Sequence, residues 1–163
     1  MPTRRFAAAL MVLLVVGSLL LARQKTRVRS AAAMTTAYQA FLKTLDEGQA
    51  KRCRFAFADK ERVNWHFIPR VRKGLPVRDL EGAPLRAALG LLRSGLSEAG
   101  YDQSLNVMSL EEVLYLLEGG DRQSRRDNRD PGKYYISIFG KPGASGSWGW
   151  RFEGHHLSLN YTF

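Results

Sequence analysis

The sequence predicts an α+β protein, in which N-terminal helices and a short hairpin are followed by an antiparallel β-meander. Apolar residues recur at helical spacing over 34–45 and 85–96, whereas they alternate with polar residues from 134 to the end. Helices first and strands afterwards are typical of α+β folds. The composition, 45% apolar with 10% aromatic residues, is that of a globular chain.

The first 33 residues form a segment of their own. Arg4 and Arg5 precede an uncharged apolar run over 6–22, which is followed by the basic stretch 23–29. As a helix of ~1.5 Å rise per residue, this run falls just short of the ~30 Å hydrocarbon core of a bilayer. Residues 1–33 are therefore predicted to be a signal peptide or N-terminal membrane anchor plus linker.

This leader predicts an exported protein that is periplasmic, extracellular or membrane-anchored and facing outward. The arginine pair resembles a twin-arginine signal, whereas the strongly apolar core favours the general secretory route, so both routes stay open. Ala31–Ala33 offers small residues for cleavage. We expect contact with a membrane only through residues 6–22, and only if the leader is uncleaved.

The charge distribution argues against a nucleic-acid partner. The net charge is +10, but residues 1–33 hold six basic residues and no acidic one. Residues 34–163 hold 19 basic against 15 acidic residues, which is not the concentrated basic stripe that binds a phosphate backbone. Cys53 is the only cysteine, which excludes an internal disulfide and a multi-cysteine zinc site. We expect it to be a small residue packed beside a strand.

A helix and a hairpin are expected in the first part of the domain. Residues 34–45 place Tyr38, Phe41, Leu42 and Leu45 on one helical face, at i, i+3, i+4 and i+7. Alternating side chains over 55–57 and 63–67, with a turn-capable segment between them, predict the hairpin. Two prolines keep the stretch 69–80 irregular or extended.

Two more helices and a loop are expected before the sheet. Residues 85–96 have one apolar helical face, and the segment around Gly100 is predicted to end that helix. Ser109 and Glu112 have the spacing of a capping box, which predicts a helix that begins at Ser109 and stops at Gly119–Gly120. The charged segment 121–132 is predicted to be a solvated loop.

Three strands in succession complete the predicted fold. Residues 134–139, 148–153 and 155–163 each alternate apolar and polar side chains, and short glycine-containing segments separate them. Strands joined by short turns form an antiparallel meander.

Several unusual strings occur together and in one order. They are FAFADKERVNWHFIPRVRKGLPVRDL, LLRSGLSEAGY, VMSLEEVLYLLEGG, YYISIFGKP and WGWRFEGHHLSLNYT. Together they resemble the domain-of-unknown-function 3500 family of exported bacterial proteins over nearly all of residues 34–163. The resemblance implies that Gly154-His155-His156 is the family's Gly-His-His element, and it implies no particular reaction.

The resemblance also bears on the end of the chain. Members of that family are typically about twice as long and carry further histidines and carboxylates in their later half. We therefore expect residues 34–163 to be the N-terminal part of an uncharacterised α+β domain, apparently truncated. The alternation at Phe163 stops without a turn residue, and such a strand would leave an unpaired edge.

The adjacent histidines are the best candidate site. In a flat strand, His155 and His156 would point to opposite faces, but Gly154 permits a bulge or tight turn that brings both imidazoles to one side. Zinc or iron needs three or four nitrogen or oxygen ligands. A divalent metal would therefore take His155 and His156, with His66 as the candidate third ligand.

Two neighbours of the histidines complete the candidate catalytic set. Glu153 is placed to act as a general base beside a histidine. Arg151, flanked by aromatic residues, is a candidate cation–π partner or anion clamp. Metal ligation, acid–base catalysis and a purely structural hydrogen-bonded pair all stay open for His155 and His156.

Other features fit binding of a small molecule, a glycan or an anionic partner. The basic residues Arg70, Arg72, Lys73 and Arg78 suit a carboxylate or phosphate, and Trp65, Trp148 and Trp150 suit a sugar ring. No phosphate-binding or dinucleotide fingerprint is present. The sequence thus leaves two functions open, an exported metal-dependent enzyme and a non-catalytic envelope protein.

Overall fold

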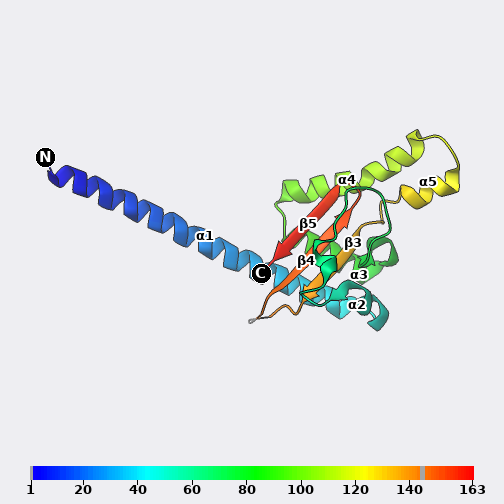
Figure 1. The fold of residues 1–163 in the computed structure, drawn as a ribbon, viewed down its shortest axis with the longest axis horizontal. Helices are drawn as coiled ribbons and strands as arrows, with labels where there is room; N and C mark the ends of the chain where they lie inside the picture. The colour runs from blue at the N-terminus through cyan, green and yellow to red at the C-terminus, as the bar shows by residue number, and fades with distance from the viewer. Residues whose placement is uncertain (1, 144–145) are drawn as a thin grey trace. The chain divides into compact units, whose positions relative to one another are not determined.

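The computed structural model describes residues 2–143 and 146–163, and it confirms the α+β class (Figure 1). Helices accompany a five-stranded mixed sheet. The chain divides into two compact units, Met1–Ala33 and Met34–Phe163.

The long helix α1 extends over Pro2–Thr44, through the first unit and into the second. Residues 23–33, which we predicted to be a linker, are helical. None of the helices, searched over the described residues, is both long and apolar enough to cross a bilayer. The signal peptide and the membrane anchor remain predictions.

The predicted meander is confirmed in the second unit. β3 (Tyr135–Gly140), β4 (Trp148–Gly154) and β5 (Leu157–Thr162) pair antiparallel in that order. Two short strands extend the sheet, because β1 (Arg54–Phe55) pairs parallel with β3 and β2 (Leu75–Pro76) pairs antiparallel with it. β4 is therefore central, and β5 forms an edge of the sheet.

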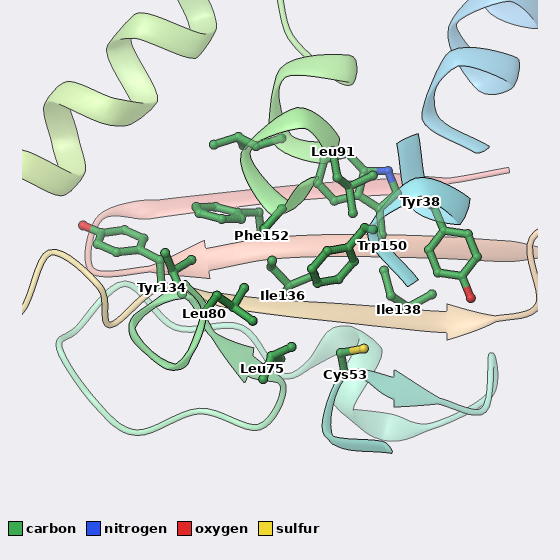
Figure 2. Packing of buried hydrophobic residues seen from close by; sticks show 14 of the residues in the cluster. Tyr38, Cys53, Leu75, Leu80, Leu91, Tyr134, Ile136, Ile138, Trp150 and Phe152 are labelled. Atoms are coloured by element: carbon green, nitrogen blue, oxygen red, sulfur yellow. The ribbon is translucent and has the colours of Figure 1, made fainter. Parts of the chain in front are cut away.

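One face of the sheet carries the aromatic core. Trp150 and Phe152 of β4 lie among Tyr38 of α1 and Leu91 of α3 (Gly82–Ser94), as Figure 2 shows. Trp150 also stacks on Tyr161 of β5, with ring centroids 4.5 Å apart. These contacts fix the register of β4 and β5, because a slip of one residue would move every core side chain to the opposite face.

Cys53, the last residue of α2 (Glu47–Cys53), belongs to this core and is fully buried. Burial raises the pKa of its thiol to about 11. The prediction of a small residue packed beside a strand is thus confirmed. A buried thiol with a raised pKa is also expected to be unreactive.

The predicted hairpin over 55–67 is wrong. Only β1 forms, and it pairs with β3 rather than with residues 63–67. The chain instead enters the short 3₁₀ helix η1 (Lys60–Val63), because the Asp59 carboxylate accepts a hydrogen bond from the Glu61 amide and caps it. Trp65 and Phe67, which we expected in a strand, lie in an exposed loop.

The helix boundaries also differ from the prediction. α4 runs from Glu98 to Leu117 and is capped by Ser97, whose hydroxyl accepts from the Gly100 amide. The segment around Gly100 therefore begins a helix. Ser109 lies within α4 and donates to the Asn106 carbonyl, so its predicted capping box does not exist.

The segment predicted to be a charged loop contains helix α5 (Arg122–Asn128). Asp121 caps α5 by accepting from the Ser124 amide. This cap, together with the ion pair between Arg126 of α5 and Glu112 of α4, holds a helix in this strongly charged segment.

Candidate functional site

The two histidines form the turn between β4 and β5. Gly154 pairs with Leu157, so His155 and His156 are the two turn residues. His156 has φ of 55° and is the only non-glycine residue of the described chain with a positive φ. The turn brings the imidazoles together, with ring centroids 4.1 Å apart and planes inclined by 33°. The rings meet as we predicted, and of the two predicted arrangements, a bulge or a tight turn, the structure has the turn.

Gly154 is required for a steric reason. Its φ is not positive, whereas a Cβ at this position would lie 2.2 Å from the Tyr134 ring. The Tyr134 hydroxyl donates to the His155 carbonyl at 3.0 Å, so the ring that excludes a side chain at 154 also holds the turn. Burial raises the pKa of Tyr134, as does the nearby Glu111, and the hydroxyl stays a donor.

His155 is bound to a buried carboxylate. Its Nδ1 contacts Oε1 of Glu111, a residue of α4 that is 3% exposed. An ionised carboxylate only accepts hydrogen bonds, so this contact favours a proton on Nδ1 and leaves Nε2 of a neutral imidazole as an acceptor. The contact also fixes the orientation of the ring.

An arginine and a second carboxylate surround this pair. Arg129 lies 3.6 Å from Oε2 of Glu111 and 2.6 Å from Oε1 of Glu118, measured from its Nη1 and Nη2. The hydrogen bond from Arg129 lowers the pKa of Glu118. Arg129 thus places a positive charge beside the buried Glu111 side chain.

His156 is held from the side of the exposed loop. Its amide donates to the Phe67 carbonyl at 3.0 Å, and its ring stacks on the Phe67 ring with centroids 6.2 Å apart. His156 itself is exposed. The site therefore pairs a partly buried imidazole, held by Glu111, with an accessible one.

Arg151 and Glu153 lie in a buried chain of ion pairs on the other face of the sheet. Nη2 of Arg151 lies 2.8 Å from Oε1 of Glu61 and 2.8 Å from Oε1 of Glu153. The Glu153 carboxylate has no aligned hydrogen bond, so Coulomb attraction holds it to Arg151 and to Arg72, 3.5 Å away. Burial raises the pKa of Glu153, while Arg151 and Arg72 oppose that rise.

Neither of these two residues forms a hydrogen bond or ion pair with His155 or His156 within the part of the chain that the structure describes. They support the strand that leads to the turn. Their predicted catalytic role therefore stays a prediction, and the contacts described above do not support it.

His66 is close to the turn through its backbone only. Its carbonyl accepts from Arg72 at 2.6 Å, and the same Nη2 donates to the Gly154 carbonyl at 3.1 Å. The His66 imidazole lies instead 3.3 Å from Oδ1 of Asn64. Across the described ranges, no group of three or more His, Cys, Asp or Glu residues could hold a metal ion.

Three of the seven residues expected to bind a glycan or an anion are buried. Trp148 and Trp150 are buried in the core, and only Trp65 is exposed. Arg72 of the basic cluster is buried as well, with its guanidinium bound to backbone carbonyls. The predicted three-tryptophan platform therefore does not form.

A polar cavity of about 440 Å³ lies beside the histidine site. Arg129 lines this cavity and also contacts His155. The volume is in the range of small-molecule sites. Its full lining is Pro69, Glu118, Gly119, Asp121, Ser124, Arg125, Asn128 and Arg129.

The carboxylate partner of His155 escaped the sequence analysis because we assigned it to a helix start. Ser104, Met108, Glu111 and Tyr115 are the buried residues of α4 and lie at i, i+4, i+7 and i+11. A glutamate on the buried stripe of a helix needs a partner, because a lone buried charge is costly. That position was the available signal for Glu111, whereas nothing in the sequence connects Arg129 with it.

Fold and site together define an α+β protein with a histidine–carboxylate pair at a hairpin turn. A family model described as protein of unknown function (DUF3500) matches residues 27–163, and the chain belongs to this family. The resemblance noted from the sequence is thereby confirmed. No match was found among curated proteins or among solved structures.

Proposed function

We propose that the protein is an exported enzyme in which His155 transfers a proton to or from a small polar substrate. The observation that carries this proposal is the contact between His155 Nδ1 and the buried Glu111 carboxylate. A carboxylate that fixes the tautomer of a histidine leaves the opposite nitrogen available as a general base. Export is proposed from the leader alone, with its basic start and apolar core.

The surroundings of His155 support this role. His156, adjacent and accessible, supplies a second imidazole that can bind or protonate a reacting group. Arg129 balances the charge of Glu111 and lines the neighbouring polar cavity. Strained backbone is often found at functional sites, and His156 keeps an imidazole where glycine would fit more easily.

Hydrolysis of an activated ester tests the proposal without knowledge of the substrate. Free imidazole cleaves 4-nitrophenyl acetate slowly, so a positioned imidazole should do so faster. We expect His155→Ala to remove most of the activity and Glu111→Gln to reduce it. His66→Ala is the matched control, because His66 bonds to the neutral Asn64. Equal losses in the His155 and His66 variants would refute the proposal.

A second candidate is a divalent metal held by His155 and His156. The 4.1 Å separation of their rings favours it, and a carboxylate on the remote nitrogen is the usual support of a metal-bound histidine. Titration of the full chain with Co²⁺ tests this idea. One bound ion per chain, lost in both His155→Ala and His156→Ala, would support it, and His66→Ala shows whether His66 contributes.

A further inference from the structure

We infer that the loop of residues 63–71 docks on an anionic lipid bilayer. Five large apolar side chains of this docking loop are 46% to 70% exposed. They are Val63, Trp65, Phe67, Ile68 and Val71. So many exposed apolar residues within one short loop mark an interaction surface, and the inference does not depend on the proposed acid–base role.

The charges around the docking loop select a lipid surface as the partner. Residues 63–69 contain no Lys, Arg, Asp or Glu, whereas Arg62 precedes them and Arg70 and Lys73 follow. The acidic residue nearest to them in the sequence, Glu61, is buried and paired with Arg151, and the acidic residues Glu118 and Asp121 lie only at the Pro69 end of the loop. An apolar tip with tryptophan and phenylalanine, bordered by cations, is the pattern of segments that lie in the interface of an anionic membrane.

Backbone carbonyls of the docking loop accept hydrogen bonds from the protein itself, as an environment that is poor in water requires. The His66 and Ile68 carbonyls accept from Nη2 of Arg72 at 2.6 and 2.8 Å. The Phe67 carbonyl accepts from the His156 amide at 3.0 Å. Irregular backbone normally resists insertion because its carbonyls lose their hydrogen bonds to water. Here three consecutive carbonyls are satisfied from inside the protein.

The base of the docking loop is anchored to the sheet. Arg72 is buried against Glu153 of β4, and Arg151 of β4 donates to the Glu61 carbonyl at 2.7 Å. Both ends of the loop are thus fixed while its apolar side chains face outward. A pre-ordered loop loses little conformational entropy on docking.

Tryptophan fluorescence tests the inference directly. The chain has three tryptophans, and Trp148 and Trp150 are buried, so a change on lipid addition reports Trp65. We expect vesicles of phosphatidylglycerol and phosphatidylcholine to shift the emission of the full chain to shorter wavelength, and brominated lipid to quench it. Pure phosphatidylcholine and high salt should weaken both effects. Trp65→Phe should abolish the signal.

Two variants separate the docking loop from the rest of the chain. Arg70→Ser combined with Lys73→Ser should lose the shift, whereas Leu117→Ser, which removes an exposed apolar side chain of α4, should keep it. Residues 6–22 are the same in every variant. Unchanged Trp65 emission with these vesicles, even if the chain sediments with them, would overturn the inference. So would a shift that appears without lipid and grows with protein concentration, because a second copy would then cover the loop.

Discussion

Replacing Arg151 by methionine should be among the most destabilising single changes in the domain. Arg151 is fully buried and lies 2.8 Å from carboxylate oxygens of both Glu61 and Glu153. The substitution keeps most of the side-chain volume and leaves two carboxylates without their shared cation. Removing one partner of a buried pair costs about 3–5 kcal/mol of unfolding free energy.

The cost should depend on pH in a direction set by Glu153. Burial places the folded pKa of Glu153 above its unfolded value. Such a group contributes stability while it is protonated and loses that contribution as pH rises through its folded pKa. Without Arg151 the folded pKa rises further. The penalty of Arg151→Met should therefore be largest at neutral pH and should shrink as the solution is acidified.

Guanidinium unfolding curves of the wild type and the variant at neutral and mildly acidic pH provide the measurement. Arg52→Met is the matched control, because Arg52 lies 2.6 Å from Asp79 in an exposed pair with side-chain exposures of 50% and 36%. Exposed pairs contribute about 0–1 kcal/mol. If Arg151→Met costs no more than Arg52→Met, or if its cost grows on acidification, the ion-pair chain does not stabilise the protein as described.

Three further predictions follow from single positions. Gly154→Ala should lower the free energy of unfolding by about 1–3 kcal/mol, because the new Cβ would meet the Tyr134 ring. Gly90→Ala is the control: this position on α3 faces open space, so the substitution should raise the free energy of unfolding by about 0.5–1 kcal/mol. His156→Gly should leave the free energy of unfolding unchanged or raise it by about 1 kcal/mol, because it relieves the positive φ. The same substitution should reduce ester hydrolysis. A large loss of stability would show that the imidazole ring itself holds the turn. Cys53 should resist thiol reagents at pH 8 until the protein unfolds, because it is buried and its pKa is raised to about 11, so rapid labelling of the folded chain would contradict its placement.

The fold could be predicted where one periodicity extended over a whole element. Trp148, Trp150 and Phe152 alternate with polar residues, and β4 follows. The same rule failed for Val63, Trp65 and Phe67, which alternate equally well; Val63 ends η1, and Trp65 and Phe67 lie in an exposed loop. Alternation indicates a strand only when a neighbouring strand can pair with it, and β1 takes the place beside β3.

The candidate site could be predicted only in its local part. The adjacency of His155 and His156 after a glycine located the turn, because local sequence sets hairpin geometry. Glu111 and Arg129 come from elements far along the chain, and their approach to His155 depends on how α4 packs near the β4–β5 turn. Glu153 lies next to the histidines in the sequence, but its carboxylate pairs with Arg151, so its predicted catalytic role stays a prediction.

The central claim is that Glu111 holds His155 in a single tautomer for proton transfer, and the nitrogen-15 spectrum of the imidazoles tests it most directly. A long-range ¹H–¹⁵N correlation on the full chain should show the neutral His155 ring protonated at Nδ1 and free at Nε2. Glu111→Gln should weaken that preference, and the His66 ring should not respond. A His155 ring protonated at Nε2, or one that is indifferent to Glu111, would contradict the account.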